Sequence, residues 1–211
     1  MRSLTATPLT SASFARFGAV IEAGLESVAV NQGRGRRFEL ALDLAAADVR
    51  ATRPVAALYS IEASKLPFTV KLIERHPLSP QLFFPNRAGR FLVCVFDAQA
   101  DGEPDAHAAH AFIGNAAQGI VYRAGVWHGP LVALDAPADF LMQMWQCDGP
   151  LDCEERILAG SLSIRVAQAT FGELAGDLFG ADTQPLPPGA ENVSGRIKQL
   201  LKEKLRAKHS R

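Results

Sequence analysis

The sequence predicts a mainly β protein, built as an antiparallel sandwich or barrel. Three observations favour this class. Many short apolar runs have the length of strands, turn residues separate them at regular spacing, and almost no helical periodicity lies between them. The composition agrees, with 17 Gly and 13 Pro among 211 residues, as is typical of a turn-rich β protein. A Rossmann arrangement is excluded because no crossover helices alternate with the strands.

The first predicted element is a short helix in the segment SASFARFG. Thr10 or Ser11 can cap it, Phe14 and Phe17 lie on one face, and Gly18 ends it. Strand-like runs follow, separated by turns rich in Pro, Gly and Asn. They cover residues 38–44, 55–63, 68–75, 81–85, 90–97, 109–114, 118–125, 130–135 and 139–147.

The chain divides into a predicted barrel domain over residues 1–160 and a C-terminal extension over residues 161–211. Within the extension, residues 182–194 form a Pro-rich linker. Residues 194–208 repeat apolar side chains at helical spacing, which predicts a basic amphipathic helix. Residues 191–211 hold seven Lys and Arg against two Glu. We interpret this helix as packing its apolar stripe on the barrel or on a second subunit.

Composition and charge exclude several classes of function. The formal net charge is zero, so nothing indicates nucleic-acid binding. The three cysteines form no CxxC pair, which fits a reducing cytosol better than a disulfide framework. The N-terminus lacks the apolar core of a secretory signal, and no run reaches the length of a membrane span. We expect a soluble, cytoplasmic protein that does not bind membranes.

Polar residues with useful chemistry gather at the end of the run over residues 68–75. Residues two apart share a face of a strand, so Glu74 and His76 point the same way and Arg75 points the other way. Gln81 begins the next run after a turn with two prolines. His128 lies later, in the segment RAGVWHGP. A barrel would let these two segments face each other across its mouth.

These two segments resemble the paired motifs of the cupin superfamily, H-x-H-x(3–4)-E and P-x-G-x-x-H. Glu74 stands at the first His position, His76 at the second, Gln81 at the Glu position and His128 at the last His. Arg123 stands where cupins have Pro. The resemblance implies a cupin-type antiparallel β-barrel, a double-stranded β-helix, with a short N-terminal helix and a C-terminal helical extension.

A narrower resemblance covers residues 4–158. The segments LTSASFARFGAVIE, VNQGRGRRFELAL, ERHPLSPQLFFP and HAFIGNAAQGIVYRAGVWHGPL are similar to the ureidoglycolate lyase family, formerly called ureidoglycolate hydrolase. This resemblance implies a homodimer that splits (S)-ureidoglycolate into glyoxylate and urea, a late step of allantoin breakdown in purine catabolism.

The residues supply the parts that this reaction needs. Collapse of the substrate requires a base for its hydroxyl proton and an acid for the departing nitrogen. Histidine titrates near neutrality and serves in either role, so His76 and His128 are the candidate catalytic residues, with Glu74; the sequence leaves open which is base and which is acid. Five residues are candidates for binding the substrate. Gln81 suits the ureido group and Arg37 or Arg75 the carboxylate, while Asn31 and Tyr122 are further polar candidates.

A metal ion and two other functions stay open at this point. His76, His128, Glu74 and Gln81 form a nitrogen and oxygen set able to hold nickel, manganese or zinc, which would act as a Lewis acid. One alternative function is another metal-dependent cupin enzyme, a dioxygenase or isomerase, acting on a small hydroxy acid. The other is a non-catalytic cupin that binds a small acid.

Overall fold

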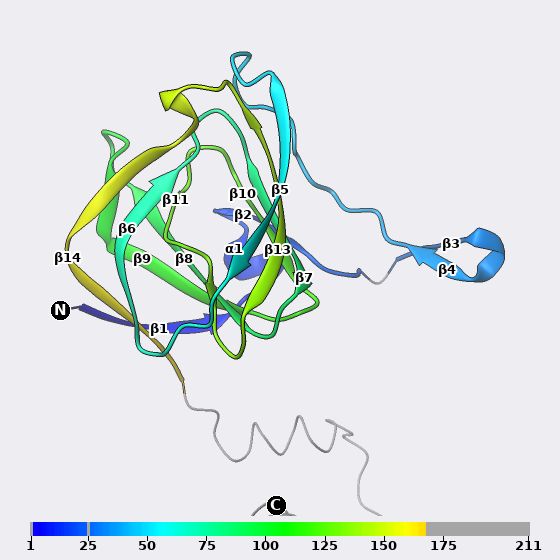
Figure 1. Cartoon of the computed structure of the whole chain (residues 1–211), viewed down its shortest axis with the longest axis horizontal. Helices are drawn as coiled ribbons and strands as arrows, with labels where there is room; N and C mark the ends of the chain where they lie inside the picture. Colours follow the sequence, from blue (N-terminus) through cyan, green and yellow to red (C-terminus); the bar gives the residue numbers. More distant parts are fainter. Residues whose placement is uncertain (1, 25, 168–211) are drawn as a thin grey trace, which may run out of the picture. The chain divides into compact units, whose positions relative to one another are not determined.

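The computed structural model describes residues 2–24 and 26–167, and these residues are mainly β-strands (Figure 1). They form three sheets of seven, five and two strands. The larger two make the barrel, and the two-stranded sheet is a separate hairpin. The predicted β class is therefore correct.

The seven-stranded sheet closes on itself because β11 pairs with both β6 and β8. A closed sheet has few free edges, which removes sites for unwanted strand pairing. Its strands, in spatial order, are β11 (Trp127–His128), β6 (Phe68–Arg75), β14 (Glu154–Val166), β1 (Arg2–Pro8), β9 (Pro104–Gly114), β8 (Phe91–Ala98) and β12 (Val132–Ala133).

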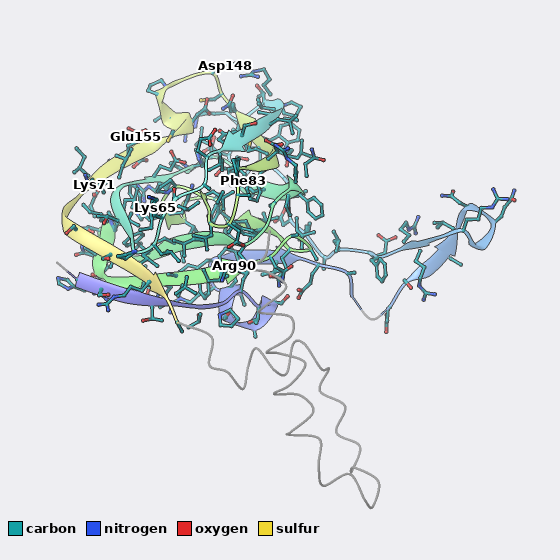
Figure 2. The ribbon with its side chains drawn as sticks, turned by 60° about the horizontal axis from the view of Figure 1, so that its bottom comes forward. Lys65, Lys71, Phe83, Arg90, Asp148 and Glu155 are labelled. Carbon is teal, nitrogen blue, oxygen red and sulfur yellow. The ribbon has the colours of Figure 1, made fainter. Side chains whose placement is uncertain are left out.

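The five-stranded sheet is antiparallel throughout. Its strands, in spatial order, are β2 (Gly18–Ile21), β10 (Gly119–Tyr122), β7 (Gln81–Arg87), β13 (Ala138–Gln146) and β5 (Arg53–Ile61). Phe83 of β7 is buried within the barrel, whereas Lys71 and Glu155 are exposed on strands of the closed sheet (Figure 2).

Strand β8 separates two hydrophobic cores. Because side chains alternate along a strand, Val93 and Val95 enter the core shared with the five-stranded sheet, and Leu92 and Cys94 enter the core inside the closed sheet. All four side chains are buried. The run over residues 90–97 is thus apolar on both faces because both faces are covered.

The predicted N-terminal helix is present as α1 (Ser11–Phe14). Thr10 caps it, and Ser13 completes a capping box, which satisfies amide groups that the first turn leaves free. Phe14 and Phe17 are both buried in the core between the sheets. At Gly18 the chain enters β2, where a Cβ atom would fall 1.7 Å from the carbonyl oxygen of Val121.

The two-stranded sheet consists of β3 (Val28–Val30) and β4 (Gly35–Arg37), joined by the turn η1 (Asn31–Gly33). A strand was predicted over residues 38–44, and this prediction is wrong because β4 ends at Arg37. Leu40 in this segment is 44% exposed. Its apolar pattern has no neighbouring strand to pair with.

Strands β1 and β14 were not predicted. They pair in parallel, and β1 also pairs in parallel with β9, so the closed sheet is mixed rather than wholly antiparallel. Strand β14 continues past residue 160, where we expected the barrel domain to end. The predicted linker and basic helix of the extension lie outside the described residues. None of the helices in residues 2–24 and 26–167 has the length and hydropathy of a membrane span.

Candidate active site between the two sheets

The site forms where β6 and β11 run antiparallel, with His128 directly opposite Glu74. His128 is also opposite Val95 of β8, which belongs to the core between the two sheets. Directly opposite residues share a face of the sheet, so Glu74 and His128 face the five-stranded sheet. The amide of Gly125 donates to the carbonyl of His76 at 2.9 Å, which joins the two sequence segments.

The turn before His128 depends on glycine. Gly125 has φ 78°, a left-handed conformation that residues with a Cβ atom rarely adopt. The amide of Val126 then donates to the carbonyl of Arg123 at 3.2 Å. This turn brings the chain directly into β11 and explains why glycine precedes His128 by three residues.

Both histidines approach the same oxygen of Glu74. Nε2 of His128 lies 3.4 Å from Oε1 of Glu74, and Nε2 of His76 lies 3.8 Å from it. The ring centroids of the two histidines are 5.5 Å apart. The pKa of Glu74 is well below its ordinary value, chiefly because of His128 and next because of His76, while burial acts in the opposite direction.

Backbone carbonyls orient both imidazole rings. Nδ1 of His76 lies 2.7 Å from the carbonyl oxygen of Asp152, and Nδ1 of His128 lies 2.9 Å from that of Val126. A carbonyl can only accept, so Nδ1 carries a proton in each ring. In a neutral ring, Nε2 then presents a bare lone pair to the carboxylate of Glu74. A proton on Nε2, or a metal ion bound by these residues, would remove the repulsion.

Tyr122 and Gln81 complete the buried group from the five-stranded sheet. The ring of Tyr122 stacks on His128, with centroids 4.2 Å apart and planes at 11°, and Tyr122 is directly opposite Gln81 in the β10–β7 register. Four buried polar atoms of this group lack a hydrogen-bond partner among the described residues: Nε2 of His76, Nε2 of His128, Oε1 of Gln81 and the hydroxyl of Tyr122. Such atoms are costly to bury unpaired, so their gathering indicates a ligand site.

The structure places Arg75 away from this group. As strand alternation predicts, its guanidinium points to the other face, where it binds Glu154 at 2.8 Å and the carbonyl of Gly102 at 2.8 Å and stacks over Trp127. These contacts already use its charge, so Arg75 does not reach the other site residues.

Arg37 and Asn31 also lie apart from the buried group, because both belong to the β3–β4 hairpin. Arg37 pairs with Glu39 at 2.6 Å, with both side chains largely exposed. Asn31 begins the hairpin turn and is exposed. Five of the eight predicted site residues are thus brought together, and three are not.

Two residues near the site were not singled out in the sequence. Cys153 donates its thiol to Oε2 of Glu74 at 3.6 Å, and burial with the nearby Glu74 raises its pKa to about 12. Tyr59 of β5 packs edge-on against Phe83, with ring centroids 5.4 Å apart. Burial and then the carboxylate of Glu74 raise the pKa of Tyr59. Strand alternation alone could have found Tyr59, whereas Cys153 carries no local signal.

The residues present fit a divalent metal ion. One ligand atom each from Glu74, His76 and His128 lies within 4.8 Å of the others. The unpaired Nε2 atoms are free to coordinate, and Nδ1 of each ring is held by a carbonyl, the usual outer contact of a metal-bound histidine. A set of imidazole and carboxylate ligands suits borderline ions such as zinc, nickel or manganese.

Fold and site together define the class of protein. A mainly β barrel holds two imidazoles and a carboxylate at one point between its sheets, next to a phenol and a primary amide. Side chains of these types carry out acid–base or metal-assisted catalysis in enzymes.

Comparison with known proteins identifies the family. Residues 1–165 match the family described as ureidoglycolate lyase. A curated relative with this name from Pseudomonas syringae pv. syringae is 35% identical, and the match covers 76% of this chain and 93% of the relative. One from Burkholderia mallei is 41% identical, and the match covers 67% of this chain and 82% of the relative. A third relative, from Azotobacter vinelandii, is 36% identical, and the match covers 74% of this chain and 92% of the relative. The chain belongs to the ureidoglycolate lyase family and is an enzyme of the lyase class.

Solved structures show a more distant likeness. A dTDP sugar isomerase from Desulfovibrio desulfuricans G20 matches with a TM-score of 0.40 and 14% identity, over 68% of this chain and 87% of that one. A variant of Bacillus subtilis oxalate decarboxylase matches with a TM-score of 0.34 and 18% identity, over 50% of this chain and 24% of that one.

Proposed function

We propose that this enzyme cleaves (S)-ureidoglycolate to glyoxylate and urea, as a step in allantoin and purine breakdown. Membership of the ureidoglycolate lyase family supports this substrate. The observation that carries the chemistry is the pair of buried imidazoles, each with an unpaired Nε2 atom directed at one carboxylate oxygen.

The reaction needs two proton transfers and no water. One carbon of the substrate bears a hydroxyl, a carboxylate and the ureido nitrogen. When a base removes the hydroxyl proton, the oxygen forms the C=O bond of glyoxylate and the C–N bond breaks. An acid gives a proton to the departing nitrogen, which leaves as urea. The proton removed equals the proton supplied, so the enzyme is restored after each turnover.

The two histidines can share these roles because both Nε2 atoms lie beside Oε1 of Glu74. A carboxylate at this point stabilises positive charge on whichever ring has accepted a proton. Gln81 and Tyr122 offer an amide and a neutral phenol to the substrate; burial raises the pKa of Tyr122, so its hydroxyl remains a donor. We propose that Gln81 binds the ureido group, which has both donors and acceptors.

A divalent metal ion would be held by Glu74, His76 and His128, with Gln81 beside them. When bound, it would polarise the hydroxyl and carboxylate oxygens of the substrate as a Lewis acid. The protein residues would still have to orient the substrate and exclude water from the space between the sheets.

We further propose a cytoplasmic homodimer. All three cysteines are free thiols, as expected in a reducing compartment. The outer face of the five-stranded sheet carries an apolar row in which Leu58, Leu141 and Phe84 are directly opposite one another on β5, β13 and β7. They are 67%, 43% and 39% exposed. A contiguous exposed apolar row favours contact with another protein surface.

The test is glyoxylate release from (S)-ureidoglycolate by purified protein, with released nitrogen assayed as urea and as ammonia. Glyoxylate with urea is the expected result. Glyoxylate with ammonia would indicate an amidohydrolase instead. The proposal is contradicted if glyoxylate release does not exceed the spontaneous rate, with or without added divalent metal. That result would favour another cupin enzyme or a non-catalytic small-acid binder.

A further inference from the structure

In the part of the chain that the structure describes, no positive side chain is bonded to the buried group that forms the site. Among the described residues, no lysine or arginine forms an ion pair with Glu74 or a hydrogen bond with the two histidines, Gln81 or Tyr122. The arginines of the barrel are engaged elsewhere. Six pair with carboxylates: Arg16, Arg53, Arg75, Arg87, Arg90 and Arg156.

The β3–β4 hairpin also carries an arginine, and the ion pair of this arginine involves no residue of the barrel. Arg37 pairs only with Glu39, and both side chains are largely exposed, 62% and 75%. Exposed pairs of this kind contribute little, so the guanidinium of Arg37 can exchange its partner for another carboxylate at small cost.

One face of the hairpin is apolar and includes Arg37. Val28 is directly opposite Arg37 and Val30 is directly opposite Gly35, so these four residues share a face. A Cβ atom at Gly35 would lie 3.7 Å from Nδ2 of Asn31, which places the amide of Asn31 on this face too. Val28 is 54% exposed, so the face lacks a covering surface in the described part of the chain.

The hairpin is not held by its own barrel. Strand β2 fixes the chain before the hairpin. After the hairpin, the indole of Trp145 donates to the carbonyl of Leu44 at 2.9 Å, and the amide of Ala47 donates to the carbonyl of Leu78. Within the described residues, no hydrogen bond or ion pair joins residues 26–43 to a barrel strand.

The opening of the site offers a place for this face. Tyr59, on the edge strand β5, is 42% exposed, and the side chain of Glu74 is 36% exposed. The ring of Tyr59 packs edge-on against Phe83 at 5.4 Å, and Phe83 packs against Tyr122 of the site at 6.3 Å between ring centroids. We call the β3–β4 hairpin the arm. The ring of Tyr59 offers an apolar surface for Val28 and Val30 of an arm, while Arg37 of the same arm can bind a carboxylate in the site.

We propose that two copies of this chain exchange their β3–β4 hairpins, so that Arg37 of one copy enters the site of the other and binds the substrate carboxylate. This inference rests on the proposed function for the identity of that carboxylate. Two-fold symmetry allows one kind of contact to cover the apolar arm of each copy. Guanidinium binds carboxylate through two parallel hydrogen bonds, which would orient the substrate over His76 and His128.

The test is complementation between two inactive variants, Arg37→Ala and His128→Ala, co-expressed with different tags and purified as the mixed dimer. Loss of a charged partner lowers kcat/KM by at least about 30-fold in Arg37→Ala. The mixed dimer then holds one site with an intact barrel and an intact arm, so about half of wild-type activity returns. No return of activity would mean that the arm acts within its own chain or not at all. Near-normal activity of Arg37→Ala would equally overturn the proposal.

A control and a second readout separate this inference from the proposed function. Arg87→Ala removes an exposed arginine of β7 that pairs with Asp139, and it should keep wild-type activity. Independently of any substrate, Val28→Cys with Tyr59→Cys should give a covalent dimer after treatment with a bismaleimide. A crosslink within one chain, or none, would contradict exchange of the arms. If the wild type is inactive while the double-cysteine variant still gives the covalent dimer, only the proposed substrate is contradicted.

Discussion

The thiol of Cys153 and the imidazoles of His76 and His128 approach different oxygens of the Glu74 carboxylate. The thiol donates to Oε2 of Glu74 at 3.6 Å, and the two Nε2 atoms approach Oε1. Because burial and Glu74 raise the pKa of Cys153 to about 12, the thiol stays protonated at neutral pH. Glu74 thus has a fixed donor on one side and exchangeable protons on the other.

This relationship predicts how Cys153 reacts. Only the thiolate is nucleophilic, so Cys153 should react slowly with iodoacetamide at pH 8 although it is only partly buried. Glu74→Gln removes one cause of the raised pKa and should increase the alkylation rate severalfold, as measured by peptide mass spectrometry. Cys147, which does not contact Glu74, serves as the internal reference. An unchanged ratio of the two rates would show that Glu74 does not control this thiol.

His76→Ala and His128→Ala should each lower kcat by about 10²–10⁴-fold, the usual contribution of a general acid or base. The fold should persist, as judged by circular dichroism and by the intrinsic fluorescence of Trp127 and Trp145. His107→Ala is the matched control, because His107 is exposed on β9 and should leave kcat unchanged. Near-normal turnover in either site variant would remove that histidine from the mechanism.

Tyr122→Phe should separate activity from stability. The phenylalanine ring can keep the stacking on His128, while the change removes a buried hydroxyl that has no hydrogen-bond partner among residues 2–24 and 26–167. Losing an unsatisfied buried group should be neutral or stabilising by about 1 kcal/mol, measured by urea unfolding. The same change should lower kcat/KM by about 10-fold, because the substrate loses a hydrogen bond. A large loss of stability would mean that the hydroxyl has a structural partner.

Glu74 should make the stability of the protein depend on pH. Its folded-state pKa is below the ordinary value of 4.5, so the charged carboxylate stabilises the fold above that pH and the contribution is lost as pH falls below it. Glu74→Gln should cost about 1–2 kcal/mol at pH 6, allowing for partial exposure. The difference from wild type should shrink toward pH 3. A stability difference between Glu74→Gln and wild type that stays constant with pH would contradict the assignment.

Metal binding can be measured directly on the purified protein. Stripping with a chelator and titrating with zinc, nickel or manganese by calorimetry should give one site per chain. His128→Ala should weaken it by at least about 10-fold, since each ligand contributes strongly. Equal binding to wild type and His128→Ala would place the metal elsewhere, and the effect of chelation on turnover would show whether the ion takes part in the reaction.

Much of the site could be predicted because its signals are local. Alternation along residues 68–75 indicated that Glu74 and His76 share a face and that Arg75 does not, and the structure agrees. The likeness of the segment RAGVWHGP to the second cupin motif indicated that His128 faces Glu74 and His76, and His128 is directly opposite Glu74. Within a strand, the geometry of two neighbouring residues depends on the backbone alone.

What could not be predicted depends on pairing between distant segments. Strand β14 was missed, and with it the contact of Cys153 with Glu74, because the register of β14 on β6 joins residues far apart in the chain. The run over residues 38–44 looked like a strand, but its apolar side chains have no sheet to join. Arg37 likewise carries the right chemistry, while its placement depends on contacts outside the hairpin.

The pairing of β14 with both β6 and β1 has a consequence for synthesis of the chain. β6 carries Glu74, and its partner β14 is the last strand of the barrel to leave the ribosome. The carbonyl of Asp152 that orients His76 also emerges late. The candidate site is therefore incomplete while the barrel is being translated. A nascent chain halted before residue 154 should be inactive however much of its core has collapsed.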